Sequence, residues 1–141
     1  MKRTVDKISS SAVRRFVRGT LGCSCPDEVF EAVRIVKEPP WFDGLPGDYL
    51  LAIGHRLLVC VISTTPWQEV MENLETLFIR GCEMRDAEGF NRFRLVVATP
   101  DNRTAEAALM GQFGTLSDRD SRLHLHVVTP ECLEELERTN D

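Results

Sequence analysis

The sequence has no apolar run long enough to cross a membrane, and its first residues lack the apolar core of a secretion signal. Its five cysteines are an odd number without regular spacing, which argues against a disulfide framework and favours free thiols in a reducing compartment. We therefore expect a cytoplasmic protein that has no membrane partner.

Concentrated positive charge is also missing, since the net charge is −5, with 17 lysines and arginines against 22 acidic residues. Binding to nucleic-acid phosphates needs clustered Lys and Arg, so we expect no nucleic-acid partner. The charge is nevertheless uneven, because residues 1–20 are basic and residues 131–141 are acidic. This pattern predicts two solvated faces that lie near each other; the alternative is a basic helix that docks on an acidic partner.

Recognisable catalytic motifs are absent as well. The chain has no Gly-x-Ser-x-Gly nucleophile elbow, no His-Glu-x-x-His zinc motif and no glycine-rich phosphate loop. The sequence therefore does not identify the protein as an enzyme.

What is present is one pattern that occurs three times: an apolar run ends at Thr-Pro and is followed by a helix-like segment. The three runs are 58–66, 93–100 and 123–130. Threonine suits the N-cap of a helix, and proline suits the first helical position. Three such units in series predict parallel strands joined by helical crossovers.

The other segments complete the fold prediction. A helix opening at residues 9–11 has apolar residues at helical spacing, and two apolar runs around Gly54-His55 predict an antiparallel hairpin. We predict one α/β domain over residues 1–141, with a basic N-terminal helical segment (1–25) packed on it. Its mixed five-stranded sheet would contain one antiparallel hairpin, then parallel βαβαβ units, with helices on its faces. Residues 82–91 are expected to form a charged connector, and the alternating strand near residue 125 should lie towards a sheet edge.

The Thr-Pro turns are the first candidate site. Carboxyl ends of parallel strands meet at one edge of the sheet, where open α/β sheets bind ligands and helix N-termini favour anions. We expect the crossovers to reverse direction there and leave a crevice bordered by Thr99, Asp101, Asn102 and Thr129. The alternative is purely structural, because Thr-Pro is also a good helix start.

Cys23 and Cys25 form the second candidate site, just before a predicted helix. Two sulfurs at this spacing could bind a soft metal or cycle between dithiol and disulfide. His124 and His126 should project from one face of a strand, where they could share one Zn²⁺ or Fe ion and complete a Cys₂His₂ set. The alternative is that the cysteines pack in a tight turn and the histidines line the polar face of a near-edge strand.

Three classes of function stay open. The leading interpretation is a binding or interaction module with a protein partner or a second copy of the chain, because edge strands often pair across a two-fold axis. The alternative is a thiol-redox or metal-binding protein that uses the two cysteines. The third is a small-molecule enzyme that acts at the Thr-Pro edge.

Overall fold

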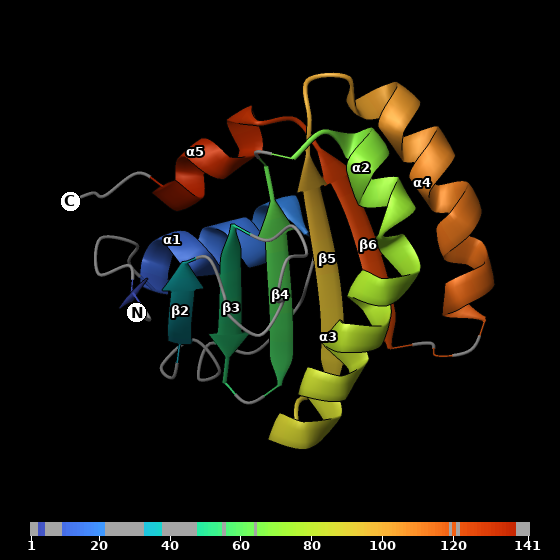
Figure 1. Cartoon of the computed structure of the whole chain (residues 1–141). Coiled ribbons are helices and arrows are strands. Elements are labelled where there is room, and N and C mark those ends of the chain that lie inside the picture. Colours follow the sequence, from blue (N-terminus) through green and yellow to red (C-terminus); the bar gives the residue numbers. More distant parts are fainter. Residues whose placement is uncertain are drawn as a thin grey trace.

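The computed structural model describes residues 3–4, 10–21, 33–37, 48–54, 56–63, 65–118, 120 and 122–137, and Figure 1 shows a sheet with helices on both faces. The short helix η1 (Phe16–Thr20) is a π-helical continuation of helix α1 (Ser10–Arg15). Within the described ranges, none of the helices combines the length and apolar character that a membrane span requires. In chain order the elements are β1 (Arg3–Thr4), α1 (Ser10–Arg15), η1 (Phe16–Thr20), β2 (Val33–Lys37), β3 (Tyr49–Ile53), β4 (Leu57–Ile62), α2 (Trp67–Glu72), α3 (Leu74–Glu88), β5 (Arg92–Ala98), α4 (Asn102–Ser117), β6 (Leu123–Val128) and α5 (Glu131–Glu137).

The order of the strands in the sheet, β1-β2-β3-β4-β5-β6, is also their order along the chain. The pairs from β1 to β4 are antiparallel, whereas β4, β5 and β6 are parallel. Gly54 turns the hairpin between β3 and β4 with a φ of 58°, which a residue with a Cβ rarely adopts. The predicted mixed sheet, hairpin and edge position of β6 are therefore confirmed, and the two-residue strand β1 is added to the five that were predicted.

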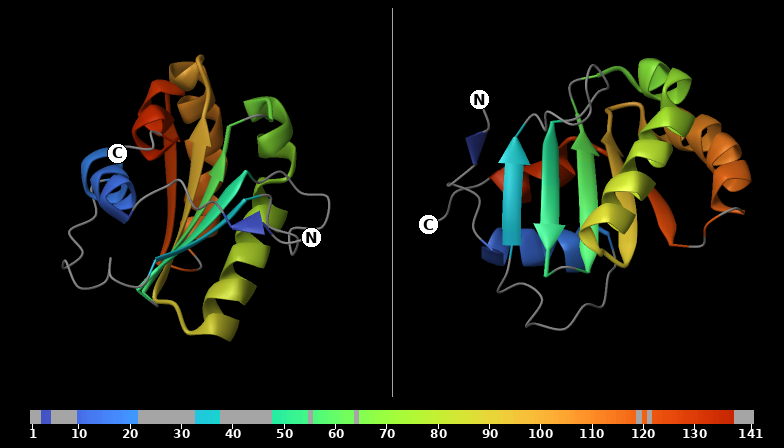
Figure 2. Two further views of the ribbon diagram at one scale, coloured as in Figure 1. Left: turned by 90° about the vertical axis from the view of Figure 1, so that its left-hand side faces the viewer. Right: turned by 60° about the horizontal axis from the view of Figure 1, so that its bottom comes forward.

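Each face of the sheet has its own apolar core. Helices α2, α3 and α4 cover one face, and α1, η1 and α5 cover part of the other; the left-hand view of Figure 2 shows α1 and α5 opposite α2 and α3. We call these the α3/α4 face and the α1/α5 face. Val97 belongs to the first core and Val96 to the second, and both are 0% exposed. The second half of β5, from Leu95 to Ala98, is thus covered on both faces, as expected for a central parallel strand.

Both crossovers run in the same direction. The chain passes from β4 through α2 and α3 to β5, and then from β5 through α4 to the next strand, β6. Right-handed connections that advance in one direction place all their helices on one face of the sheet. The predicted reversal of the crossovers is therefore wrong, and the parallel part of the sheet has no topological switch point.

The basic and acidic ends of the described chain lie together. Helix α1, which ends in Arg14 and Arg15, packs beside α5, whose first turn carries Glu131 and Glu134. Figure 1 shows the two helices on the same side of the sheet. This arrangement supports the interpretation of two charged faces that lie near each other.

Helix α3 is longer than the sequence pattern indicates. Residues 82–88, expected as a connector, continue the helix to Glu88, where Gly89 ends it with a φ of 80°. Gly81 does not end the helix, because it is the contact point of α3 with β5. A Cβ at this position would come within 2.6 Å of three atoms of the Phe93 ring. The expected connector is wrong because a tertiary contact, and not a chain break, requires this glycine.

The threonines of the first two Thr-Pro turns, Thr65 and Thr99, do not cap the helices that follow. Pro66 occupies the N-cap position of α2 and Asp101 that of α4, and neither helix has a side-chain cap hydrogen bond. The Thr-Pro pattern correctly marked where each strand passes into a helix. The capping role predicted for Thr65 and Thr99 is wrong.

Candidate functional site

Four polar side chains lie together on the α1/α5 face, along β5 and β6. Side chains alternate between the faces of a sheet, so Arg92 and Arg94 share this face with His124 and His126. The residues between them, such as Phe93, join the core of the opposite face. Arg94 lies directly beside His124 in the register of the two strands. We call these four residues the arginine–histidine surface.

Each arginine reaches diagonally to a histidine on the neighbouring strand. Arg92 Nη1 lies 3.0 Å from His124 Nε2, and Arg94 Nη1 lies 2.9 Å from His126 Nε2. A guanidinium can only donate, so each Nε2 must accept. The two imidazoles are therefore neutral, with their proton on Nδ1.

Burial and positive charge keep both imidazoles neutral. The pKa of His126 is lowered to about 4, first by burial and then by the positive charges of Arg94 and His124. The pKa of His124 is lowered by burial and by the charges of Arg94 and Arg92. At neutral pH the surface therefore carries the charge of the two guanidiniums alone.

No described carboxylate balances these two charges. The pKa of Arg94 is lowered by its burial and by repulsion from Arg92, and its Nε is buried without a hydrogen-bond partner. Residues two apart on a strand are separated by about 7 Å, so two like charges are held close together. An anion placed between the guanidiniums would relieve the repulsion. It would also accept hydrogen bonds from the guanidinium N–H groups that do not contact histidine.

The surface is unsuited to the metal ion that the two histidines suggested. Each Nε2 lone pair already accepts a hydrogen bond from a guanidinium. The positive charge of that guanidinium also repels a metal cation. Within the described part of the chain, no three His, Cys, Asp or Glu side chains form a group that could hold a metal. Cys23 and Cys25 lie outside the described residues, so a Cys₂His₂ site formed with the histidines stays a hypothesis.

The three Thr-Pro turns lie at one edge of the sheet, as predicted, because β4, β5 and β6 are parallel (Figure 1). Thr99 is nearly buried, and its N–H donates to the last carbonyl of β6 at 2.9 Å. Asp101 is exposed, whereas Asn102 and Thr129 are partly exposed. Since the crossovers do not reverse, the topological reason for a crevice at this edge is gone. Ligand binding by these four residues stays a prediction.

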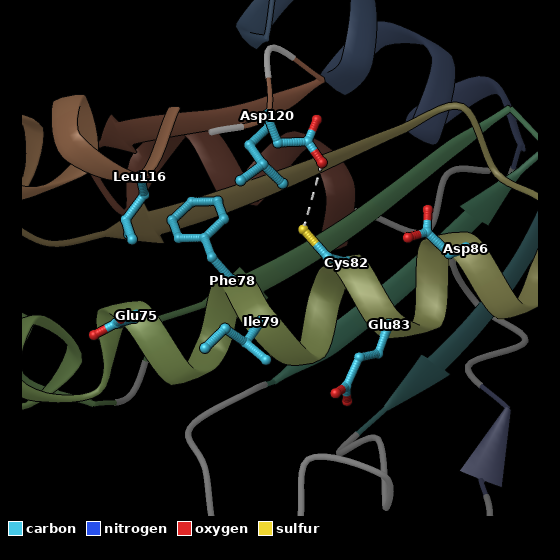
Figure 3. A pocket seen from close by; sticks show the side chains of 9 residues that line it. Glu75, Phe78, Ile79, Cys82, Glu83, Asp86, Leu116 and Asp120 are labelled. Carbon is cyan, nitrogen blue, oxygen red and sulfur yellow. Dashed lines mark hydrogen bonds between the residues drawn. The ribbon is translucent and has the colours of Figure 1, made fainter. Parts of the chain in front are cut away.

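A further site, which sequence reasoning missed, is a cleft of about 320 Å³ between α3 and the end of α4 (Figure 3). Most of its lining comes from α3, including the part that was expected to be a connector. The signal that could have revealed this cleft is a helical pattern that continues through Gly81. The lining combines apolar and acidic side chains: Glu75, Phe78, Ile79, Cys82, Glu83, Asp86, Leu116, Asp120 and Leu123.

Buried Arg85 positions one wall of this cleft. Its side chain is 2% exposed, its Nη2 donates to Asp120 Oδ2 at 2.6 Å, and its Nε donates to Asp86 Oδ1 at 3.0 Å. The hydrogen bond from Arg85 is the main cause that lowers the pKa of Asp120. Arg85 thus ties α3 to the loop before β6, and it pairs with two acidic side chains of the cleft, Asp86 and Asp120.

The thiols of Cys60 and Cys82 are not activated for chemistry. Burial raises the pKa of Cys60 well above its usual value. Burial also raises the pKa of Cys82 more than the charge of Arg85 lowers it. Both thiols stay protonated at neutral pH, and a protonated thiol is a poor nucleophile and metal ligand.

Comparisons of the chain with protein-family models, with curated proteins and with solved structures found no match. The fold and its sites define a mixed α/β domain with a basic surface on one face of the sheet and an acidic, apolar cleft on the other.

Proposed function

We propose that this protein is a binding domain that recognises a small anion at its arginine–histidine surface. The proposal rests on one observation: Arg92 and Arg94 point from the same face of β5 with no carboxylate partner among the described residues. Elsewhere in the described chain, buried Arg85 is paired with two carboxylates. A guanidinium pair without acids is costly in the unliganded protein and becomes favourable when an anion binds.

The chemistry favours a phosphate or phosphate-monoester group. Each guanidinium has five N–H donors, and the contact with histidine occupies Nη1 only. The remaining donors can form paired hydrogen bonds to the oxygens of a phosphate or a carboxylate. A phosphate carries between one and two negative charges near neutral pH, which matches the two arginines more closely than a single carboxylate does.

Titration with inorganic phosphate, followed by amide shifts, tests the proposal. The largest shifts are expected in residues 92–94 and 124–126. Arg94→Gln should weaken binding about tenfold, because it removes a charge-assisted contact. Arg34→Gln is the matched control, since Arg34 is exposed on β2 and points to the opposite face while the change in net charge is the same.

Two results would contradict the proposal. Equal weakening in both variants would show that only the overall charge matters. Shifts confined to Thr99, Asp101, Asn102 and Thr129 would move the ligand to the Thr-Pro edge.

Self-association is a second candidate function, favoured by the position of β6 at the edge of the sheet. The carbonyls of Arg122 and Val128 point towards β5, because they accept from the N–H groups of Phe93 and Thr99. By alternation, the N–H and C=O groups of Leu125 point away from the sheet, where a second β6 could pair with them. Sedimentation equilibrium at micromolar concentration would detect such a homodimer, and a monomer at all concentrations would exclude it.

The thiol-redox or metal-binding alternative depends on Cys23 and Cys25. Elemental analysis for Zn and Fe, together with thiol titration of the native protein, would decide it. The free thiols of Cys60, Cys82 and Cys132 support a reducing compartment such as the cytoplasm as the place where the protein works.

A further inference from the structure

The cleft between α3 and α4 lies on the opposite face of the sheet from the arginine–histidine surface, and its chemistry is different. We infer that this cleft binds a small hydrophobic cation, such as an alkyl or aryl amine. The inference does not depend on the proposed anion site.

The floor of the cleft is apolar and well packed. Phe78, Leu116 and Leu123 are at most 8% exposed, and the ring of Phe78 packs on Phe113 with a centroid distance of 5.2 Å. At the rim, Ile79 is 47% exposed, whereas the other large apolar side chains whose burial is described are buried or partly buried. An apolar ligand on this floor would remove Ile79 from water, which provides the driving force for binding.

The cleft continues into a second hollow. A second hollow of about 270 Å³ adjoins it along α4 and shares Glu75 and Leu116 with it; Gln112 and Thr115 complete its lining. The combined groove falls in the size range of ordinary small-molecule sites. An alkyl chain bound in this groove would lie between α3 and α4.

The charge around the cleft selects the sign of the ligand. Four carboxylates and no basic side chain line it. Arg85 pairs with Asp86 and Asp120, whereas Glu83 is exposed and forms no ion pair with a described residue. Figure 3 shows Glu83 on the same side of α3 as Ile79, and both residues belong to the lining of the cleft. An ammonium group at Glu83 would place the apolar part of the ligand over Ile79 and the floor.

The test compares three ligands that differ only in their head group. Octylammonium, octanol and octanoate, each below the concentration at which it aggregates, are titrated into the protein and followed by amide shifts. Octylammonium should bind at least about tenfold more tightly than octanol, with shifts centred on residues 75–83 and 116–123, and octanoate should bind most weakly. Equal binding of octanol, tighter binding of octanoate or no binding of octylammonium would each overturn the inference.

Two matched variants locate the charge that matters. Glu83→Gln should reduce the affinity for octylammonium to that of octanol and leave octanol unchanged. Glu88→Gln changes the net charge equally, but Glu88 is an exposed residue at the end of α3 outside the cleft, so it should have no effect. Equal losses in both variants would show attraction by net charge alone and would overturn the inference.

A third readout uses the thiol inside the cleft. Cys82 lies in the lining, with its Sγ 3.8 Å from Asp120 Oδ2 (Figure 3). Octylammonium at saturation should slow the alkylation of Cys82 several-fold, with Cys82→Ser identifying the signal. Unchanged alkylation at saturation would place the amine elsewhere. Arg94→Gln should leave amine binding intact, so a failure of the anion proposal and a failure of this one are distinguishable.

Discussion

Replacement of Gly81 by alanine tests how α3 is seated on the sheet. An alanine in a helix interior is favoured over glycine by about 1 kcal/mol. Here, however, the added Cβ would come within 2.6 Å of three ring atoms of Phe93. Phe93 is fully buried and meets Phe78 edge to face, with centroids 5.7 Å apart and an interplanar angle of 89°. Because the overlap is with the body of a buried ring, part of the core must shift.

The expected net effect is a loss of stability. Overpacking a dense core costs typically about 1–3 kcal/mol, and this overlap involves the body of an aromatic ring and not a flexible chain end. Gly81→Ala should therefore lower the free energy of unfolding by about 1–2 kcal/mol after the gain in helix propensity. Gly111→Ala is the matched control, since Gly111 is an exposed residue within α4 and no atom would lie within 4 Å of its Cβ. That variant should gain about 0.5–1 kcal/mol.

Urea unfolding followed by circular dichroism measures both changes as shifts of the midpoint at constant slope. In the Gly81→Ala background, Phe93→Leu should cost less than it does alone, because the smaller side chain makes room for the new methyl group. A Gly81→Ala protein as stable as Gly111→Ala would refute the reasoning, because α3 could not then be in close contact with β5.

Further predictions concern the core, the pH dependence and the cysteines. Val97→Asp should abolish cooperative folding, because it places an unpaired charge in a strand covered on both faces; a soluble variant that melts cooperatively would contradict this. The pKa of His126 lies at about 4 when folded against 6.5 when unfolded, so the unfolded chain binds the proton first. Stability should be full above pH 6.5 and fall as the pH drops towards 4, by at most roughly 3 kcal/mol, and the His126→Gln protein should lack this part of the pH dependence. If the difference between the two proteins does not vary over that range, His126 is not buried as described. The double variant Cys23→Ser, Cys25→Ser should melt within a few degrees of the native protein with unchanged metal content; loss of a stoichiometric metal would favour the metal-binding alternative.

The sequence by itself determined where strands β2 to β6 lie and that the last three of them are parallel. The repeated passage from an apolar run through Thr-Pro into a helix located β4, β5 and β6 and indicated that they are parallel. The spacing of Val13, Phe16 and Val17 identified the buried side of the first helix. The alternation in β6 indicated its place at the sheet edge. These features are readable because burial on one face or on both faces imposes a local period on the chain.

Only the tertiary structure decided what the polar residues do. His124 and His126 suggested a metal until β5 placed Arg92 and Arg94 beside them, and nothing in the local pattern of either strand specifies its neighbour. The glycine in α3 looked like a helix end because its real reason, the ring of Phe93, is a contact between distant segments. Both candidate sites arise from residues that lie far apart in the sequence. Their charge balance depends on which strands and helices pack together, and packing between elements leaves no period in the sequence.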